Sequence, residues 1–178
     1  MENNDKVFDS RDKYDFKDSD QTILSTGKGL NAEVVAKISE YKHEPEWMKE
    51  IRLNALKEFE NHHLPSFGPD LKFLNYQDYT YFNRVSDKVS QTWEEVPQDI
   101  KNTFNKLGIP EAEHKFLAGV TTQYESEAVY HNMLSELTEK GVIFLDTDTA
   151  LKQYPELFKK YFGKIVPATD NKFAALNT

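Results

Sequence analysis

The stretch that most constrains the fold of this chain is QYESEAVYHNMLSELTEKG, residues 123–141. Its apolar residues Val129, Met133 and Leu137 recur every four positions, which is the spacing of one face of an α-helix. Gly141 stands where a residue of left-handed conformation would end such a helix. The pattern therefore predicts the longest helix of the chain, between two shorter helical units.

The charge and the cysteine content of the chain exclude several classes of function. The 178 residues carry 30 acidic and 22 basic side chains, and the net charge of −8 disfavours non-specific binding to nucleic acid. There is no cysteine, so these residues cannot supply a disulfide, a thiolate nucleophile or a thiolate metal ligand. No apolar run reaches the length of about eighteen residues that a membrane helix needs, and we expect a cytoplasmic protein.

Helix-capping residues divide the chain into short helical units. Asn31 can cap a helix that reaches Tyr41, Pro45 suits the start of a second helix, and Pro97 and Gly108 bound a third. The sequence therefore predicts a mainly α fold of small helical domains with at most one or two short strands. The expected parts are a flexible acidic tail, a helical pair with an aromatic loop segment, a helical subdomain and an extended tail, at residues 1–28, 29–96, 97–163 and 164–178 respectively.

Two Glu–His pairs could contribute to a metal site, and each has a simpler interpretation. Glu111 and His114 have the spacing of one half of a carboxylate di-metal motif, but the helix dipole favours acidic residues at a helix start, and a solvated helix start is the simpler interpretation. Glu127 and His131 are four residues apart on the predicted central helix and could share a face. Since no third ligand is visible, an exposed charge pair is favoured, and no catalytic, cofactor-binding or metal-ligating residue is assigned.

Two further polar pairs also have structural explanations. His62 and His63 could bind zinc, but neighbouring side chains point apart on a helix, so both are interpreted as cations near a helix C-terminus. Asp146 and Asp148 resemble the start of a calcium loop whose required glycine and glutamate are missing. Helix capping explains the two aspartates better.

The aromatic segment of Tyr76, Tyr79, Tyr81 and Phe82 is a candidate for base stacking. Because no basic residues are interleaved with these rings, a core or a partner-binding face is favoured. The sequence leaves open whether residues 76–82 form a strand.

Five blocks of the sequence carry a resemblance to a known family. The longest read NTFNKLGIPEAEHKFLAGVTTQYESEAVYHNM, GLNAEVVAKISEYKHEPEWMKEIRLNALK and GVIFLDTDTALKQYPELFKKYFG. The blocks lie at residues 29–57, 76–79, 102–133, 141–163 and 167–177. Together they resemble SufB, the scaffold subunit of the Suf iron–sulfur cluster assembly system.

What the resemblance implies is the N-terminal helical domain of a SufB-like protein, without the family's β-helix core. In the family, a right-handed parallel β-helix and a C-terminal helical region follow, and these carry the cluster-building cysteine and the surfaces for the ATPase SufC and the paralogue SufD. The resemblance implies an iron–sulfur cluster and these two partners for the full-length protein, and a non-catalytic, structural or interaction role without a cofactor for these residues. The alternative is a free-standing metal-binding or regulatory domain that uses Glu111, His114, Glu127 and His131.

Overall fold

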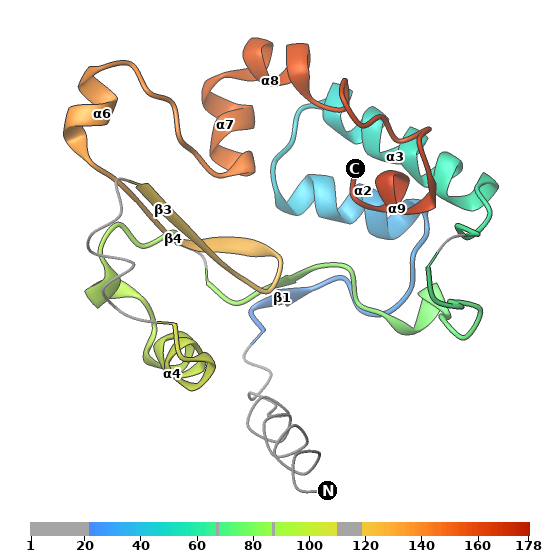
Figure 1. Cartoon of the computed structure of the whole chain (residues 1–178), viewed down its shortest axis with the longest axis horizontal. Coiled ribbons are helices and arrows are strands. Elements are labelled where there is room, and N and C mark those ends of the chain that lie inside the picture. The colour runs from blue at the N-terminus through green and yellow to red at the C-terminus, as the bar shows by residue number, and fades with distance from the viewer. Residues whose placement is uncertain (1–21, 67, 87, 110–118) are drawn as a thin grey trace, which may run out of the picture. The chain divides into compact units, whose positions relative to one another are not determined.

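The computed structural model of the chain describes residues 22–66, 68–86, 88–109 and 119–178 (Figure 1). These residues form seven α-helices, two short 3₁₀-helices and two small two-stranded sheets, which confirms the mainly α fold class. The described strands number four, more than the one or two expected. The chain divides into two compact units, and each is described by itself.

Two of the predictions fall on residues outside the described ranges. Residues 1–21 make up most of the predicted acidic tail, and residues 110–118 contain Glu111 and His114. The hypothesis of a metal site that uses Glu111 and His114 therefore stays a hypothesis.

The helical unit consists of two segments of the chain, Leu24–Asn83 and Leu145–Thr178. Its helices are α2 (Ala32–Tyr41), α3 (Glu46–Asn61), the 3₁₀-helix η1 (Tyr76–Asp78), α7 (Thr147–Gln153), α8 (Pro155–Tyr161) and α9 (Lys172–Leu176). The first two-stranded sheet pairs β1 (Leu24–Ser25) with β2 (Asn83–Arg84). As the sequence predicted, Asn31 caps α2, because its side-chain oxygen accepts a hydrogen bond from the Val34 N–H. α2 packs against α3 through buried side chains that include Leu56.

The last helix, α9, corrects the prediction that residues 164–178 form an extended tail. Asn171 caps α9 through hydrogen bonds from two backbone N–H groups of its first turn, and the helix packs against α3. Ala175 is 4% exposed and belongs to the same hydrophobic cluster as Phe59. A helix of five residues is too short to stand alone, so its stability comes from this packing rather than from a readable sequence period.

The hairpin unit contains Arg84–Phe144. Its elements are the 3₁₀-helix η2 (Trp93–Glu95), α4 (Gln98–Leu107), β3 (Gly119–Tyr124), β4 (Glu127–Met133) and α6 (Ser135–Glu139). α4 follows Pro97 and ends at Gly108, which has a left-handed φ of 74°. Both ends of this helix were therefore predicted correctly.

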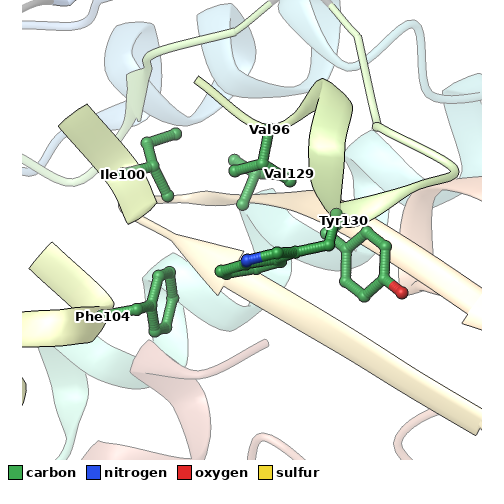
Figure 2. Packing of buried hydrophobic residues seen from close by; sticks show 6 residues of the cluster. Val96, Ile100, Phe104, Val129 and Tyr130 are labelled. Carbon is green, nitrogen blue, oxygen red and sulfur yellow. The ribbon is translucent and has the colours of Figure 1, made fainter. Parts of the chain in front are cut away.

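One hydrophobic cluster holds the hairpin unit together. Figure 2 shows Ile100 and Phe104, which come from α4, beside Val129 and Tyr130 of β4. The indole of Trp93 meets two of these rings edge-on, with ring centroids 5.8 Å from Phe104 and 5.6 Å from Tyr130. All of these side chains are at most 9% exposed, so the cluster fixes α4 against the strands.

The prediction of one long helix over residues 123–141 is wrong. β3 and β4 pair as an antiparallel hairpin, and in this stretch only Ser135–Glu139 is α-helical. Residues 125 and 126 form the turn, with Glu125 at a φ of 55°. Because the turn contains neither glycine nor asparagine, the sequence has no hairpin signal at this position.

A β-bulge explains why the spacing of apolar residues suggested a helix. Thr122 lies opposite Tyr130 and Gln123 lies opposite Ala128, so Val129 is an extra residue on β4. The bulge lets two successive side chains, Val129 and Tyr130, both be buried, whereas a regular strand would place them on opposite faces. The two-residue period of a strand is therefore lost at Val129 and Tyr130, and Leu137, the last residue of the four-residue spacing, lies on α6 and not on the strand.

Candidate functional site

Glu127 is held in a two-point ion pair with Arg84. The Arg84 Nε and Nη2 atoms donate hydrogen bonds of 2.7 and 2.8 Å to the two carboxylate oxygens of Glu127. The two side chains are only 21% and 16% exposed, so the pair is largely shielded from solvent. This bidentate contact ties Arg84, the last residue of β2, to β4.

His131 lies on the opposite face of the hairpin from Glu127. His131 pairs with Thr121 and Glu127 pairs with Tyr124, and these partners are three positions apart along a strand. The His131 Nδ1 atom is 2.7 Å from Thr121 Oγ1, and the centroid of its ring is 5.4 Å from that of Phe144. The interpretation of Glu127 and His131 as a pair on one helix face is therefore wrong, and the two cannot share a metal ion.

The adjacent histidines lie at the C-terminal end of α3, as the sequence predicted. His62 is the C-cap residue, and its backbone N–H donates to the Glu58 carbonyl. Its Nε2 atom is 3.7 Å from the Glu58 carboxylate, which is too long for a hydrogen bond. His63 is exposed. In the part of the chain that the structure describes, no group of three or more His, Asp or Glu side chains is placed to hold a metal ion.

Asp146 and Asp148 have structural roles at the start of α7. The backbone N–H and the hydroxyl of Thr149 donate hydrogen bonds of 2.9 and 2.6 Å to the Asp146 carboxylate. Asp148 forms an ion pair with Lys42, with 2.6 Å between Oδ2 and Nζ. The capping interpretation is confirmed for Asp146, and Asp148 links α7 to the end of α2.

Of the aromatic segment, Phe82 is buried, Tyr76 and Tyr81 are partly buried, and Tyr79 is exposed. Phe82 is 1% exposed, and Tyr76 meets Phe59 edge-on with ring centroids 4.9 Å apart. The Tyr81 hydroxyl donates a hydrogen bond of 2.8 Å to the Tyr76 carbonyl, while Tyr79 is 48% exposed. The segment is not a continuous strand, since η1 occupies its first three residues. These contacts favour the core interpretation over base stacking.

A buried carboxylate at the start of α3 was not recognised from the sequence. Glu44 is 2% exposed and accepts hydrogen bonds from Arg52 at 2.8 and 2.7 Å and from the Ser39 hydroxyl at 2.8 Å. Burial alone would raise the pKa of Glu44, but Arg52 and Ser39 outweigh burial and lower the pKa below its ordinary value. Arg52 also donates to the Thr178 carbonyl at 3.0 Å. No helical pairing rule covers a spacing of eight residues, so the sequence had no signal for this contact.

Lys172 closes the C-terminal end of α3 from a distant segment of the chain. Its ammonium group donates to the carbonyls of Phe59 and His62, and lies 4.0 Å from the centroid of the Phe59 ring. Burial lowers the pKa of Lys172, while the charge of Glu60 acts in the opposite direction. This lysine therefore holds α9 against α3.

Comparison with known proteins identifies the family. Residues 32–178 match the SufBD protein N-terminal region. The chain belongs to the SufBD family. An iron–sulfur cluster assembly SufBD family protein of Staphylococcus aureus (strain USA300) is 56% identical over 166 residues, which are 93% of this chain and 36% of that protein. A SufBD family protein of Staphylococcus haemolyticus (strain JCSC1435) has the same identity and coverage.

The chain spans about a third of the length of these SufBD relatives. The resemblance that the sequence blocks carried is confirmed at the level of the SufBD family, which includes both SufB and SufD. Among the residues described for this SufBD chain, no helix combines the length and the apolar character needed to cross a membrane.

Proposed function

We propose that this chain is the N-terminal region of a SufB-type scaffold subunit, with a structural, non-catalytic role in iron–sulfur cluster assembly. The observation that carries the proposal is the 56% identity, over 93% of the chain, to proteins named for iron–sulfur cluster assembly. The long blocks that resemble SufB favour SufB over SufD as the type of subunit. The proposed partners of the longer protein are SufC and SufD, and its proposed location is the cytoplasm.

The contacts of the polar side chains support a structural role. Glu44, Glu127 and Asp148 each pair with a basic residue, and Asp146 caps a helix. Iron–sulfur clusters are usually held by cysteine thiolates, and these 178 residues contain no cysteine. A cluster assembled on the longer protein would therefore take its thiolate ligands from outside this region.

A region exchange in the S. aureus relative tests the family-level proposal. Its 166 matched residues are replaced by this chain, and the exchanged protein is expressed in a strain that lacks the relative. We expect the exchanged protein to restore the activity of iron–sulfur enzymes and to co-purify with SufC and SufD, whereas a version with the region deleted should not. The SufB assignment would be contradicted if the exchanged protein restored a strain that lacks its SufD subunit but not a strain that lacks its SufB subunit.

Anaerobic titration with Fe(II) tests the non-catalytic part of the proposal. We expect the isolated chain to bind no stoichiometric iron, as measured by metal analysis after gel filtration. Stoichiometric iron that is lost on His131→Ala would contradict this proposal and support the metal-binding alternative. Glu111→Gln and His114→Ala would then show whether residues beyond the described ranges contribute ligands.

A further inference from the structure

Helix α8 has one apolar side that is covered and another that is not. Phe158 and Phe162 stack with ring centroids 4.8 Å apart, and Phe158 faces Trp47 at 6.5 Å. Leu157 and Tyr161 are 45% and 60% exposed. Because residues four apart lie on one side of a helix, each pair marks one side of α8. The side of Leu157 and Tyr161 thus remains accessible within the described part of the chain.

The accessible side continues into the residues that follow the helix. We name this surface the α8 stripe, and it consists of Tyr154, Leu157, Tyr161, Ile165 and Val166. Ile165 is 92% exposed and Val166 is 60% exposed. Single exposed apolar residues are ordinary on protein surfaces, but five large ones in one short segment mark an interaction surface.

The α8 stripe is also basic, although the chain as a whole is acidic. Residues 152–164 contain four lysines and one glutamate, whereas the net charge of the chain is −8. Lys160 and Lys164 are exposed, and neither forms an ion pair with another described residue. Lys159 lies over the Trp47 ring instead, on the covered side of the helix. The complementary surface combines apolar side chains with carboxylates. A second copy of the stripe is not complementary in this way, since a two-fold contact would bring the lysines of both copies together.

We propose that the α8 stripe docks the C-terminal part of a SufBD protein, through a face that combines apolar side chains with carboxylates. The proposal rests on the proposed function, which makes this chain the N-terminal region of such a protein. The matched region is 36% of the S. aureus relative, so nearly two-thirds of that protein lies outside it. That remainder is the partner that every longer SufBD protein has available.

Tethering favours this partner over a separate molecule. The stripe belongs to the same unit as α9, and Thr178, two residues after that helix, is held by Arg52. A segment that continues from this fixed point has an effective concentration in roughly the millimolar range at a nearby surface. A stripe of five side chains is then sufficient for docking, although it would be small for the specific binding of a free protein.

Tyrosine nitration in a full-length protein tests the proposal. The full-length protein is the S. aureus relative with its matched residues replaced by this chain, and the isolated chain is the reference. Peptide mass analysis compares Tyr161, in the stripe, with Tyr79, which is 48% exposed and lies outside it. We expect nitration of Tyr161 to be about tenfold slower in the full-length protein, as for a surface covered about 90% of the time, with Tyr79 unchanged. Equal rates for Tyr161 in the two proteins would overturn the proposal.

Variants separate docking through the stripe from other causes of protection. Ile165→Asp removes an apolar contact and Lys164→Glu reverses a charge, while Phe73→Asp changes a side chain that is 78% exposed outside the stripe. All three positions are exposed, so the thermal unfolding of the isolated chain should not change. We expect Tyr161 to regain the nitration rate of the isolated chain with Ile165→Asp and Lys164→Glu, but not with Phe73→Asp.

The remaining outcomes each count against the proposal. Protection of Tyr161 that survives both stripe variants would show that another surface docks the C-terminal part. Protection that appears in the isolated chain as its concentration rises would identify a second copy as the occupant, and protection by anionic lipid vesicles alone would identify a membrane. Because the measurement does not depend on SufC, SufD or cluster assembly, its failure is distinct from failure of the region exchange.

Discussion

Replacing Arg52 by alanine should destabilise the helical unit far more than removal of an exposed charge would. Arg52 makes two hydrogen bonds to Glu44, whose carboxylate is 2% exposed, and one to the Thr178 carbonyl. Without the guanidinium group, Glu44 would be a buried carboxylate with only the Ser39 hydroxyl as a described side-chain donor. Removal of one partner from a buried ion pair costs about 3–5 kcal/mol. Because Arg52 itself is 21% exposed and water can enter its place, we expect the lower end, about 3 kcal/mol.

The pH dependence of this loss identifies its cause. In the folded wild-type chain the pKa of Glu44 is lowered, so the stabilisation is complete above the unfolded pKa and is lost as the pH falls through the folded pKa. In the Arg52→Ala variant, burial, which raises the pKa of Glu44, is opposed only by the Ser39 hydroxyl and the charge of Lys42. We therefore expect a higher pKa for Glu44 in the variant, and protonation of Glu44 then reduces the loss of stability. The difference in free energy of unfolding between the two proteins should therefore shrink between pH 7 and about pH 4.

Urea unfolding at the two pH values measures this difference in the helical unit. In a Trp93→Phe background, Trp47 of α3 is the only tryptophan, so its fluorescence reports that unit. Lys37→Ala is the matched control, since it removes the exposed pair with Glu33 and should leave the midpoint unchanged. A loss below about 1 kcal/mol for Arg52→Ala at pH 7, or an equal loss at both pH values, would refute the reasoning.

Three further substitutions test other contacts. Tyr130→Ala should destabilise the hairpin unit by about 3–5 kcal/mol, because it removes a ring that is 2% exposed. Urea unfolding followed by Trp93 fluorescence measures this, and a loss below about 1 kcal/mol would show that the ring is not part of the core. Lys172→Ala should weaken the docking of α9 by about 1.5–3 kcal/mol through the loss of hydrogen bonds from a charged donor. Unchanged amide hydrogen exchange in α9 would contradict it. Gly119→Ala should displace the Phe144 ring, since the added Cβ would lie 2.9 Å from Phe144 Cδ1, and should cost less than about 1 kcal/mol because that ring is 37% exposed and can move. Unaltered NMR shifts of that ring would count against this contact.

The helix ends that depend on local capping were predictable from the sequence. Asn31 and Asp146 accept hydrogen bonds from the first turns of their helices, and Gly108 adopts the left-handed conformation that ends α4. Each of these interactions involves groups within a few residues of one another. Residue type and position are then enough to place a helix end.

The hairpin was missed because its stability depends on contacts between segments. Val120, Thr121, Thr122 and Tyr124 are β-branched or aromatic, and this enrichment is the signal that could have indicated β3. The bulge at Val129 removed the two-residue period that would have supported it. A helix and a bulged strand can then show the same spacing of apolar residues in a single sequence. The pairing of β4 with β3 makes this segment a strand.

The contacts of the candidate site residues were less predictable still. The partner of Glu127 is Arg84, 43 residues earlier, and the partner of Asp148 is Lys42, 106 residues earlier. Such pairs exist only once the chain has folded, because no local rule relates residues at these separations. The sequence could propose which side chains carry charge, but not which charges meet.

The wrong helix prediction over residues 123–141 invalidated the metal site inferred from spacing but did not affect the family assignment. Two side chains four residues apart are separated along the axis by about 6 Å on one side of a helix, but by about 13 Å on a strand, where the bulge also sends Glu127 and His131 to opposite faces. Any site inferred from spacing therefore fails when the secondary structure is wrong. The similarity of sequence blocks depends on residue identity and not on conformation, so the same residues that misled the fold prediction still indicated the SufBD family. The proposed function of this chain accordingly rests on identity to its relatives, whereas the docking of the α8 stripe rests on exposure and charge.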